Sequence, residues 1–143
     1  RSAAKPTATN HLTPTRPMQL DPFMKALGFE GGITAPGEAR LQVQLQAQHL
    51  NSWGSAHGGF LFSLADSVFA LASNSHGPLA VALSAHIEFM RSTRVGDLLV
   101  ATATEMNRTQ RTGVYRIEVR SGDRLVALFT GTVFRKTDND KAG

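Results

Sequence analysis

The residues of this chain that could carry out chemistry lie in one stretch in the middle of the sequence. A turn formed by His57–Gly59 leads into a nearly all-apolar run that holds a single carboxylate, Asp66. A carboxylate in such surroundings is either satisfied by hydrogen-bonding partners or used as an acid, base or nucleophile. The sequence leaves both interpretations open, and Ser63 and Ser67 are the neighbours that could satisfy Asp66 structurally.

The glycine turn is a candidate binding site for a carbonyl oxygen. Gly58 and Gly59 are predicted to open a helix, where backbone N–H groups lack intrahelical partners and carry the positive end of the helix dipole. Glycine lets a ligand approach the backbone closely, so negative charge on a carbonyl oxygen could be stabilised there. The alternative is an ordinary turn. His57 could contact the same carbonyl or only pack in the turn, and Asn51 could orient a carbonyl or water or only cap the loop.

The spacing between the glycine turn and the carboxylate limits how they can cooperate. Asp66 follows Gly58 by eight residues, which is roughly 12 Å along a helix axis. A general base and an oxyanion donor must each lie within about 3 Å of adjacent substrate atoms. If both serve one reaction, they are therefore expected to come from different subunits, across a twofold axis.

A buried helix must position these groups. It is predicted from Gly58 to Asn74, because apolar residues surround nearly its whole circumference. Its polar residues share one stripe at helical spacing: Ser63, Asp66, Ser67 and Asn74. A sheet covers only one side of such a helix, so a second copy of the chain is expected on the other side.

Strands are predicted on both sides of this helix, which makes the fold class α+β. Alternating apolar and polar residues over 37–50 predict one strand before the helix. Four runs follow the helix, and their short links predict a consecutive antiparallel meander. These runs are 79–90, 97–107, 113–120 and 124–136. A short helix over 18–29, capped by Asp21, is interpreted as a packing helix or as a lid over a pocket.

Composition bounds the class of protein. The 143 residues carry a net charge of +4, of which three charges lie in the first sixteen residues, so a basic nucleic-acid-binding surface is not indicated. We expect a disordered basic tail over 1–17, a single domain over 18–137 and a polar tail over 138–143. No apolar run is long enough to span a membrane. There is no cysteine, no spacing typical of a metal site and no serine-hydrolase elbow, and a cytoplasmic location is expected.

Four arginines lie in the predicted links after the helix. They are Arg91, Arg94, Arg108 and Arg111. Solvated loop charge is the ordinary explanation for such residues, and binding the phosphates of a nucleotide-like ligand is the alternative.

The segment LNSWGSAHGGFLFSLADSVFALASNSHG resembles the hotdog-fold acyl-CoA thioesterases, most closely the phenylacetic-acid-degradation (PaaI-like) type. The resemblance continues through HIEFMRSTRVGDLLVATA, TQRTGVYRIEV and VALFTGTVFR, and covers about residues 41–135. It implies a long central helix wrapped by a five- or six-stranded antiparallel sheet, in dimers that pair into homotetramers. It also implies that His57, Gly58, Asp66 and Asn51 occupy the family's active-site positions, with the carboxylate and the glycine turn from different subunits.

The activity implied by this resemblance is hydrolysis of phenylacetyl-CoA or hydroxyphenylacetyl-CoA thioesters to the free acid and CoA, with no metal or redox cofactor. Related enzymes carry a threonine where this chain has Ala70, so Ser67 is the expected source of a water-positioning hydroxyl. Whether Asp66 attacks the carbonyl or activates water stays open. A hotdog dehydratase and a non-catalytic acyl-CoA-binding protein are the alternative functions.

Overall fold

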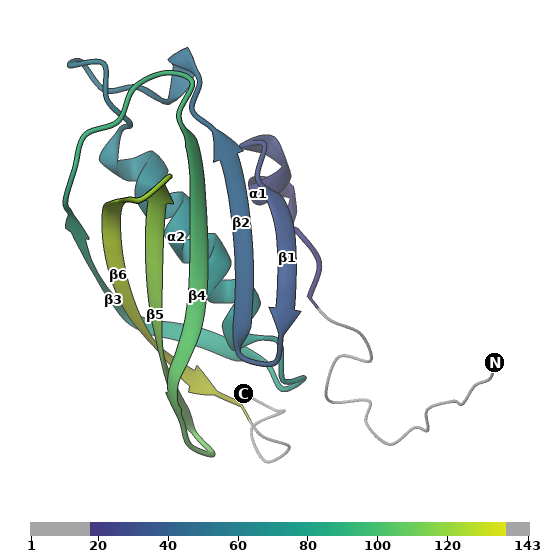
Figure 1. Ribbon diagram of the computed structural model, residues 1–143. Helices are drawn as coiled ribbons and strands as arrows, with labels where there is room; N and C mark the ends of the chain where they lie inside the picture. Colours follow the sequence, from purple (N-terminus) through teal and green to yellow (C-terminus); the bar gives the residue numbers. More distant parts are fainter. Residues whose placement is uncertain (1–17, 137–143) are drawn as a thin grey trace.

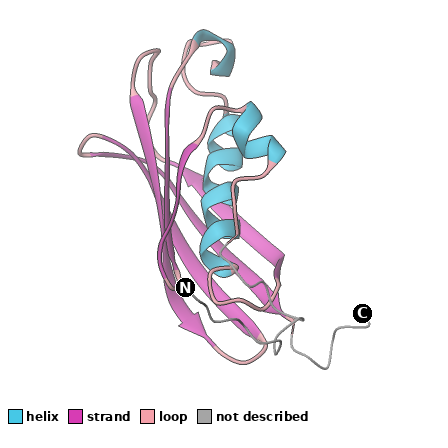
Figure 2. Ribbon diagram, turned by 90° about the vertical axis from the view of Figure 1, so that its right-hand side faces the viewer, coloured by secondary structure: helices cyan, strands magenta, loops and turns pink. Residues whose placement is uncertain are grey.

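One long helix, α2 (Gly58–Ser73), lies against a six-stranded antiparallel sheet in the computed structural model, which describes residues 18–136 (Figure 1). Across the sheet the strands run in the order β1 (Glu30–Ala35), β2 (Glu38–Gln44), β4 (Leu98–Arg108), β5 (Thr112–Ser121), β6 (Arg124–Arg135) and β3 (Ala80–Phe89). A short helix α1 (Pro22–Ala26) and a 3-10 helix η2 (Ala47–His49) complete the described part. Figure 2 shows the helices on one side of the curved sheet, so the predicted α+β arrangement is confirmed.

The side of α2 that faces the sheet is closely packed. Leu64, Val68 and Leu71 are fully buried there. The ring of Phe69 lies over Gly131 of β6, where an added Cβ would come within 2.5 Å of the ring. Only glycine lets the helix approach the sheet this closely, so Gly131 sets the depth at which α2 sits.

The opposite side of α2 is left uncovered by the described part of the chain, residues 18–136. The exposed or half-buried positions of the helix beyond its first residue follow one stripe: Gly59, Phe62, Ser63, Asp66 and Ala70. They recur every three or four residues, which is the spacing of a single helix face. The stripe therefore carries the candidate carboxylate on a face that the chain's own sheet does not bury.

The C-terminal end of α2 is fixed by a side chain. Asn74 closes the helix, as predicted, through its N–H, which donates to the carbonyl of Ala70. Its side chain accepts from the Ala80 N–H (2.9 Å) and donates to the Ala80 carbonyl (3.1 Å). The end of the helix is thereby joined to the start of β3.

Three expectations about the strands and the first helix are wrong. β3 does not pair with β4, so the four strands after α2 are not a consecutive meander; β4, β5 and β6 form one, and β3 pairs with β6 at the edge. The predicted strand over 37–50 ends at Gln44 and gives way to η2, because the His49 side chain accepts from the Gln46 N–H. The helix predicted over 18–29 shrinks to α1, and β1 lies in a segment for which no element was predicted.

The expected tails lie outside the described residues. Within residues 18–136, no helix is long and apolar enough to cross a bilayer.

A partly buried polar cluster joins the C-terminal end of α2 to the sheet. The carboxylate of Glu105 on β4 accepts from the hydroxyl of Tyr115 (2.7 Å), lies 2.6 Å from His76 Nε2 and faces Arg108 Nε at 3.4 Å. Burial alone would raise the pKa of Glu105, but the hydrogen bonds from Tyr115 and His76 and the charge of Arg108 outweigh it and lower the pKa. Burial, with the Glu105 carboxylate, raises the pKa of Tyr115, which stays a neutral donor.

Replacing Tyr115 with Phe is expected to lower the free energy of unfolding by about 1.5–3 kcal/mol, the range for a hydrogen bond to a charged group. The Tyr115 ring is fully buried and Phe retains it, so the change removes mainly the hydroxyl. Urea unfolding measures the change, and the dependence of the unfolding free energy on urea concentration (the m value) should stay the same as in the wild type. Met106→Ala, an exposed position on the same strand as Glu105, is the control, and a Tyr115→Phe effect no larger than the control would contradict the assignment.

Candidate active site

The first turn of α2 leaves one backbone donor without a partner. The Gly59 N–H donates to His57 Nδ1 (2.9 Å), and the N–H groups of Phe60 and Leu61 donate to the His57 carbonyl (2.9 and 3.1 Å). The Gly58 N–H has no acceptor among residues 18–136. It is therefore the donor of this turn that can bind a substrate oxygen, in the positive field of the helix end.

The same hydrogen bonds determine which nitrogen of His57 can donate. Since Nδ1 accepts from Gly59, the proton of the neutral ring is on Nε2. His57 therefore offers a second N–H donor beside Gly58 while it caps the helix. The sequence offered packing in the turn and contact with a carbonyl as alternatives for His57. The two are compatible, because Nδ1 accepts a hydrogen bond within the turn while Nε2 is left to donate to a substrate.

His49 supports this corner, and sequence reasoning did not identify it as a site residue. Its carbonyl accepts from the His57 N–H (2.8 Å), and its ring stacks on Phe60 with centroids 3.9 Å apart. Its Nδ1 accepts from the Gln46 N–H (3.0 Å), and burial lowers the pKa of His49, which favours the neutral ring. In the sequence, His49 is only a histidine eight residues before His57. Its contact with the site can be recognised only from the structure, where η2 places it beneath the start of α2.

Asn51 is committed largely to its own turn. Its Oδ1 accepts from the N–H groups of Trp53 (2.8 Å) and Ser55 (3.1 Å), which is the capping alternative raised from the sequence. The amide nitrogen of Asn51 is the part of the side chain left for a substrate or a water molecule.

Asp66 lies half-buried on the uncovered stripe of α2. Neither serine satisfies it: the Ser63 hydroxyl donates to the Gly59 carbonyl (2.8 Å), and within residues 18–136 Asp66 has no hydrogen bond or ion pair to Ser67 or to any other group. Burial raises the pKa of Asp66. A carboxylate held in partly apolar surroundings with no partner is suited to accept a proton or to attack a carbonyl.

Within one chain the glycine turn and Asp66 do not come together. α2 is continuous from Gly58 to Ser73, so the eight-residue offset from Gly58 to Asp66 corresponds to roughly 12 Å along the helix axis. The group next to Gly58 is instead the exposed ring of Phe89 on β3, 3.3 Å from where a Cβ at position 58 would lie.

A cavity of about 380 Å³ opens beside the glycine turn. His57, Gly59 and Ser63 line it from the side of α2, and Phe23 and Leu27 line it from the side of α1. The interpretation of the first helix as a wall or lid over a pocket is therefore consistent with its position.

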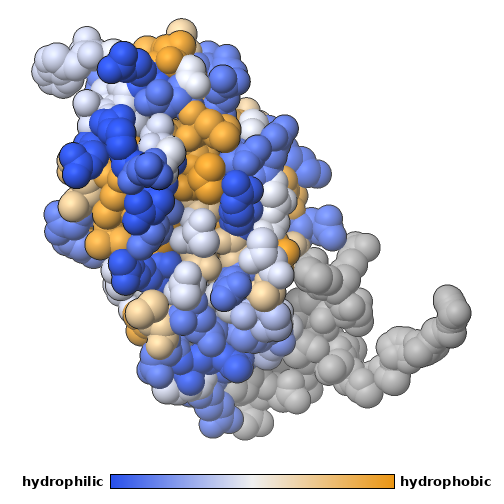
Figure 3. Space-filling model, in the orientation of Figure 1, coloured by the Kyte–Doolittle hydropathy of each residue, from blue (hydrophilic) through white to orange (hydrophobic). Residues whose placement is uncertain are grey.

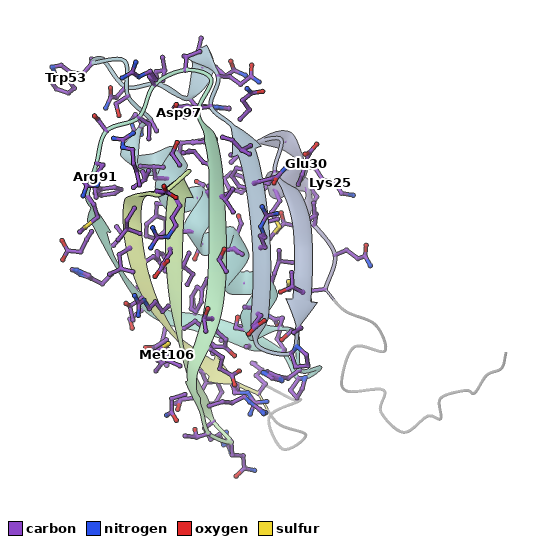
Figure 4. The ribbon with its side chains drawn as sticks, viewed as in Figure 1. Lys25, Glu30, Trp53, Arg91, Asp97 and Met106 are labelled. Carbon is purple, nitrogen blue, oxygen red and sulfur yellow. The ribbon has the colours of Figure 1, made fainter. Side chains whose placement is uncertain are left out.

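The arginines are not one cluster within a chain. Arg91 and Arg94 lie in the link between β3 and β4, whereas Arg111 follows the far end of β4 and its guanidinium lies over the Phe134 ring (5.6 Å). The eleven residues of β4 separate the two ends by roughly 35 Å. Figure 4 shows Trp53 at the upper end, Arg91 below it in the upper half, and Met106 in the lower half. Of the four predicted arginines, Arg91 and Arg94 are at the end of the molecule that holds the glycine turn.

Known proteins share both the sequence and the fold of this chain. The family model described as the thioesterase superfamily matches residues 54–128. Acyl-coenzyme A thioesterase PaaI of Escherichia coli is 45% identical over 116 residues, covering 80% of this chain and 83% of the relative.

Solved structures agree with this likeness. A mutant of the phenylacetic acid degradation protein PaaI from Thermus thermophilus is 54% identical, with a TM-score of 0.78, over 81% of this chain and all of that one. Smu.793 from Streptococcus mutans, solved with bound acetyl CoA, is 29% identical with a TM-score of 0.72, over 76% of this chain and 89% of that one. The chain has the hotdog fold and belongs to the thioesterase superfamily, as an acyl-CoA thioester hydrolase.

Proposed function

We propose that this enzyme hydrolyses phenylacetyl-CoA or hydroxyphenylacetyl-CoA thioesters to the free acid and CoA, at a site that two subunits share. The observation that carries the shared site is the position of Asp66, an unpartnered carboxylate on the uncovered stripe of α2, about 12 Å from the free Gly58 N–H of its own chain. The name of the Escherichia coli relative and the acetyl CoA bound to the Streptococcus mutans structure support the substrate class.

The assembly follows from the uncovered surfaces. If two α2 helices pack antiparallel along their uncovered stripes, each Gly58 faces Asp66 of the partner subunit, and the twofold axis passes near Phe62, midway between them. Phe62 is 37% exposed within one chain. The edge strand β3 adds further exposed apolar side chains, namely Val81, Leu83 and Phe89. Figure 3 shows apolar surface along the edge where β3 lies. Such an edge favours pairing with a second copy, and we propose a homodimer that assembles to a homotetramer.

The proposed reaction begins with the thioester carbonyl at the glycine turn. The Gly58 N–H and the Nε2–H of His57 bind its oxygen, and the amide of Asn51 helps to orient the carbonyl or water. Asp66 of the partner subunit takes a proton from water as the water attacks the carbonyl carbon. Ser67 is buried within one chain rather than on the stripe that carries Asp66, so its role in orienting that water stays a prediction. The C–S bond then breaks, and the CoA thiolate takes up the proton. In the alternative route Asp66 itself attacks, and water opens the resulting anhydride.

The rest of the chain serves binding. We propose that the cavity between α1 and α2 receives the acyl group, that Gly59 lets that group approach the backbone, and that Arg91 and Arg94 bind the CoA phosphates. Arg111 binds them only if another subunit brings it there. The absence of a metal or redox cofactor and the cytoplasmic location stay predictions.

A thiol-release assay tests the reaction. Phenylacetyl-CoA, 4-hydroxyphenylacetyl-CoA, a short alkyl-CoA and a long alkyl-CoA are compared after dialysis against EDTA, and the highest kcat/KM is expected for the two aryl substrates. Equal or higher values for the alkyl substrates would overturn the acyl assignment. If the protein binds CoA but releases thiol from none of the four substrates, the non-catalytic alternative is favoured. If it hydrates an enoyl-CoA, the dehydratase alternative is favoured.

Mixing two inactive variants is expected to restore activity if the site is shared. Asp66→Asn removes the carboxylate and Gly58→Pro removes the donor, so a mixed dimer keeps one site in which both groups are native. Random pairing makes about half of the dimers mixed, and about a quarter of the wild-type sites return.

The complementation is measured by co-expressing the two variants with different tags and isolating the doubly tagged species. A chain that carries both substitutions, paired with wild type, is the control for a site within one chain. If Gly58 and Asp66 acted within one chain, the pair of Asp66→Asn and Gly58→Pro chains would stay inactive, whereas the control pair would keep the activity of its wild-type chain.

A further inference from the structure

The one tryptophan of the chain is almost fully outside the protein. Trp53 is 89% exposed, at the tip of the turn that leads to the glycine corner. Figure 4 shows it projecting from the upper end of the molecule. A large aromatic side chain exposed to this extent is uncommon, and an exposed aromatic with one free face is suited to stack on a planar ligand.

The turn that carries Trp53 is nevertheless well fixed. The Asn51 Oδ1 accepts from the Trp53 and Ser55 N–H groups, and the Asn51 N–H donates to the Ser55 carbonyl (2.7 Å). The Gly54 N–H closes the turn on the Asn51 carbonyl (3.2 Å), with a φ of 82° that favours glycine. The backbone of Trp53 is therefore ordered before any ligand binds, which lowers the entropic cost of binding.

Hydrogen bonds attach this turn to the link that carries two arginines. The buried Thr93 hydroxyl accepts from the Ala56 N–H (3.1 Å), and the Thr93 N–H donates to the Ser55 hydroxyl (3.0 Å). Thr93 lies between Arg91 and Arg94, whose side chains are exposed. Arg124 holds the same link from β6, through a bond to the Ser92 carbonyl (2.8 Å). The turn that carries the aromatic ring and the link that carries the two guanidinium groups are thus held together by hydrogen bonds, and we call residues 51–56 and 91–94 the platform.

The platform lies within reach of the glycine turn. Gly58 is the fifth residue after Trp53, so their Cα atoms are at most roughly 18 Å apart. A ligand that extends from the Gly58 N–H to this platform would place a carbonyl at one end, negative charge near the guanidinium groups and a planar ring at the other end. A CoA thioester has these groups in this order.

We propose that Trp53 stacks on the adenine ring of CoA, on the subunit whose Gly58 binds the thioester oxygen, and that the Ser55–Thr93 hydrogen bonds align it with Arg91 and Arg94 at the phosphates. This proposal rests on the proposed acyl-CoA substrate, and it adds a residue and a position for the nucleotide end of that substrate.

Intrinsic fluorescence tests the stacking directly, because all tryptophan emission of the chain comes from residue 53. Titration with CoA and with adenosine 3′,5′-bisphosphate is expected to quench the emission, whereas phosphopantetheine, which lacks adenine, leaves it unchanged. Quenching by phosphopantetheine alone, or no quenching by CoA under conditions where calorimetry detects its binding, would overturn the proposal. Protection of Trp53 from acrylamide before any ligand is added would place it in a subunit interface and would also overturn it.

Substitutions separate stacking from charge. Trp53→Ala is expected to raise the Kd of CoA and the KM of the acyl-CoA by about tenfold, with kcat unchanged, as for loss of a base–aromatic stack. Trp53→Phe should retain most of the affinity. Arg91→Ala with Arg94→Ala should weaken binding and reduce its salt dependence. Met106→Ala and Arg40→Ala are matched exposed controls and should change neither value.

The outcomes keep this inference distinct from the proposed function. Quenching by CoA without hydrolysis of any acyl-CoA would support the platform and refute the proposed reaction. Hydrolysis with unchanged KM in Trp53→Ala would support the reaction and refute the platform.

Discussion

Replacing Asp66 with Asn is expected to lower kcat by at least about 100-fold, the usual scale for loss of a general base. The amide has nearly the shape of the carboxylate, but at neutral pH it neither accepts a proton from water nor attacks a carbonyl. Asp66 makes no hydrogen bond or ion pair within residues 18–136, so the substitution breaks no contact described within the chain. Thiol release at saturating substrate is the measurement, with Asp123→Asn, an exposed acid in the last turn, as the control.

The same variant is expected to unfold at a higher temperature than the wild type at neutral pH. Burial raises the pKa of Asp66 in the folded protein, so the fold favours the neutral acid. This contribution to stability is complete below the unfolded pKa and is lost as pH rises through the folded pKa. At neutral pH the wild type therefore bears the cost of a partly buried charge that asparagine lacks. Loss of both turnover and thermal stability would indicate a structural role for Asp66, and near-normal turnover would remove it from the chemistry.

A substitution that lowers kcat and raises the unfolding temperature indicates a residue that serves catalysis and destabilises the folded protein. The polar cluster of Glu105, Tyr115 and His76 shows the opposite case, because there the carboxylate is paired and has a lowered pKa. The pKa values of the two acids move in opposite directions because Glu105 has hydrogen-bonding partners, whereas Asp66 has none within residues 18–136. The contrast supports a working role for Asp66 more strongly than either residue does alone.

Local signals predicted the helices better than the strands. Asp21 caps α1, and α2 begins at Gly58 as expected, because caps and apolar periodicity act within a few residues. β1 was missed because its glycines are typical of a turn. Gly31 has a φ of 133° opposite Leu41, and a side chain there would collide with the Arg40 carbonyl, so this glycine is required by strand pairing.

The pairing of strands that are distant in sequence could not be predicted from the lengths of the links between them. The link between β3 and β4 is short enough to predict a hairpin, yet it is anchored elsewhere: the N–H groups of Met90 and Arg91 donate to the Val126 carbonyl, and Thr93 is buried against Ala56. β2 therefore takes the place beside β4. Treating the four arginines as one cluster is wrong for a different reason: the links before and after an antiparallel strand lie at opposite ends of that strand, whichever strands pair.

For the candidate site, the rise per residue of a helix was enough to predict that Gly58 and Asp66 lie far apart. The sequence could not predict which N–H groups of the first helical turn remain free to bind a substrate. Which N–H stays free depends on the side-chain rotamer of His57 and on the His49 carbonyl beneath it, and neither follows from residue type. At the glycine turn itself the geometry reduces the set of possible donors to the Gly58 N–H and the Nε2–H of His57, and this makes a backbone substitution informative.

Replacing Gly58 with Pro is expected to lower kcat by about 100- to 1000-fold, the range for loss of one oxyanion donor. Proline removes the N–H and is well tolerated at the first position of a helix, where no intrahelical bond is lost. His57 already has φ −63° and ψ 138°, which suits a residue that precedes proline. The helix should therefore form, and circular dichroism and thermal unfolding check that it does.

Gly58→Ala is the matched control, because it keeps the N–H and adds only a methyl group. Its Cβ would lie 3.3 Å from the Phe89 ring, so the ring must move by a few tenths of an ångström, and Phe89 is exposed enough to do so. Proline brings a Cβ to the same place, so the difference between the two variants isolates the donor from the steric change. A similar kcat for proline and alanine would show that the oxygen is held elsewhere, with the Nε2–H of His57 as the remaining donor. A large loss for proline alone would assign the oxyanion contact to the backbone of position 58.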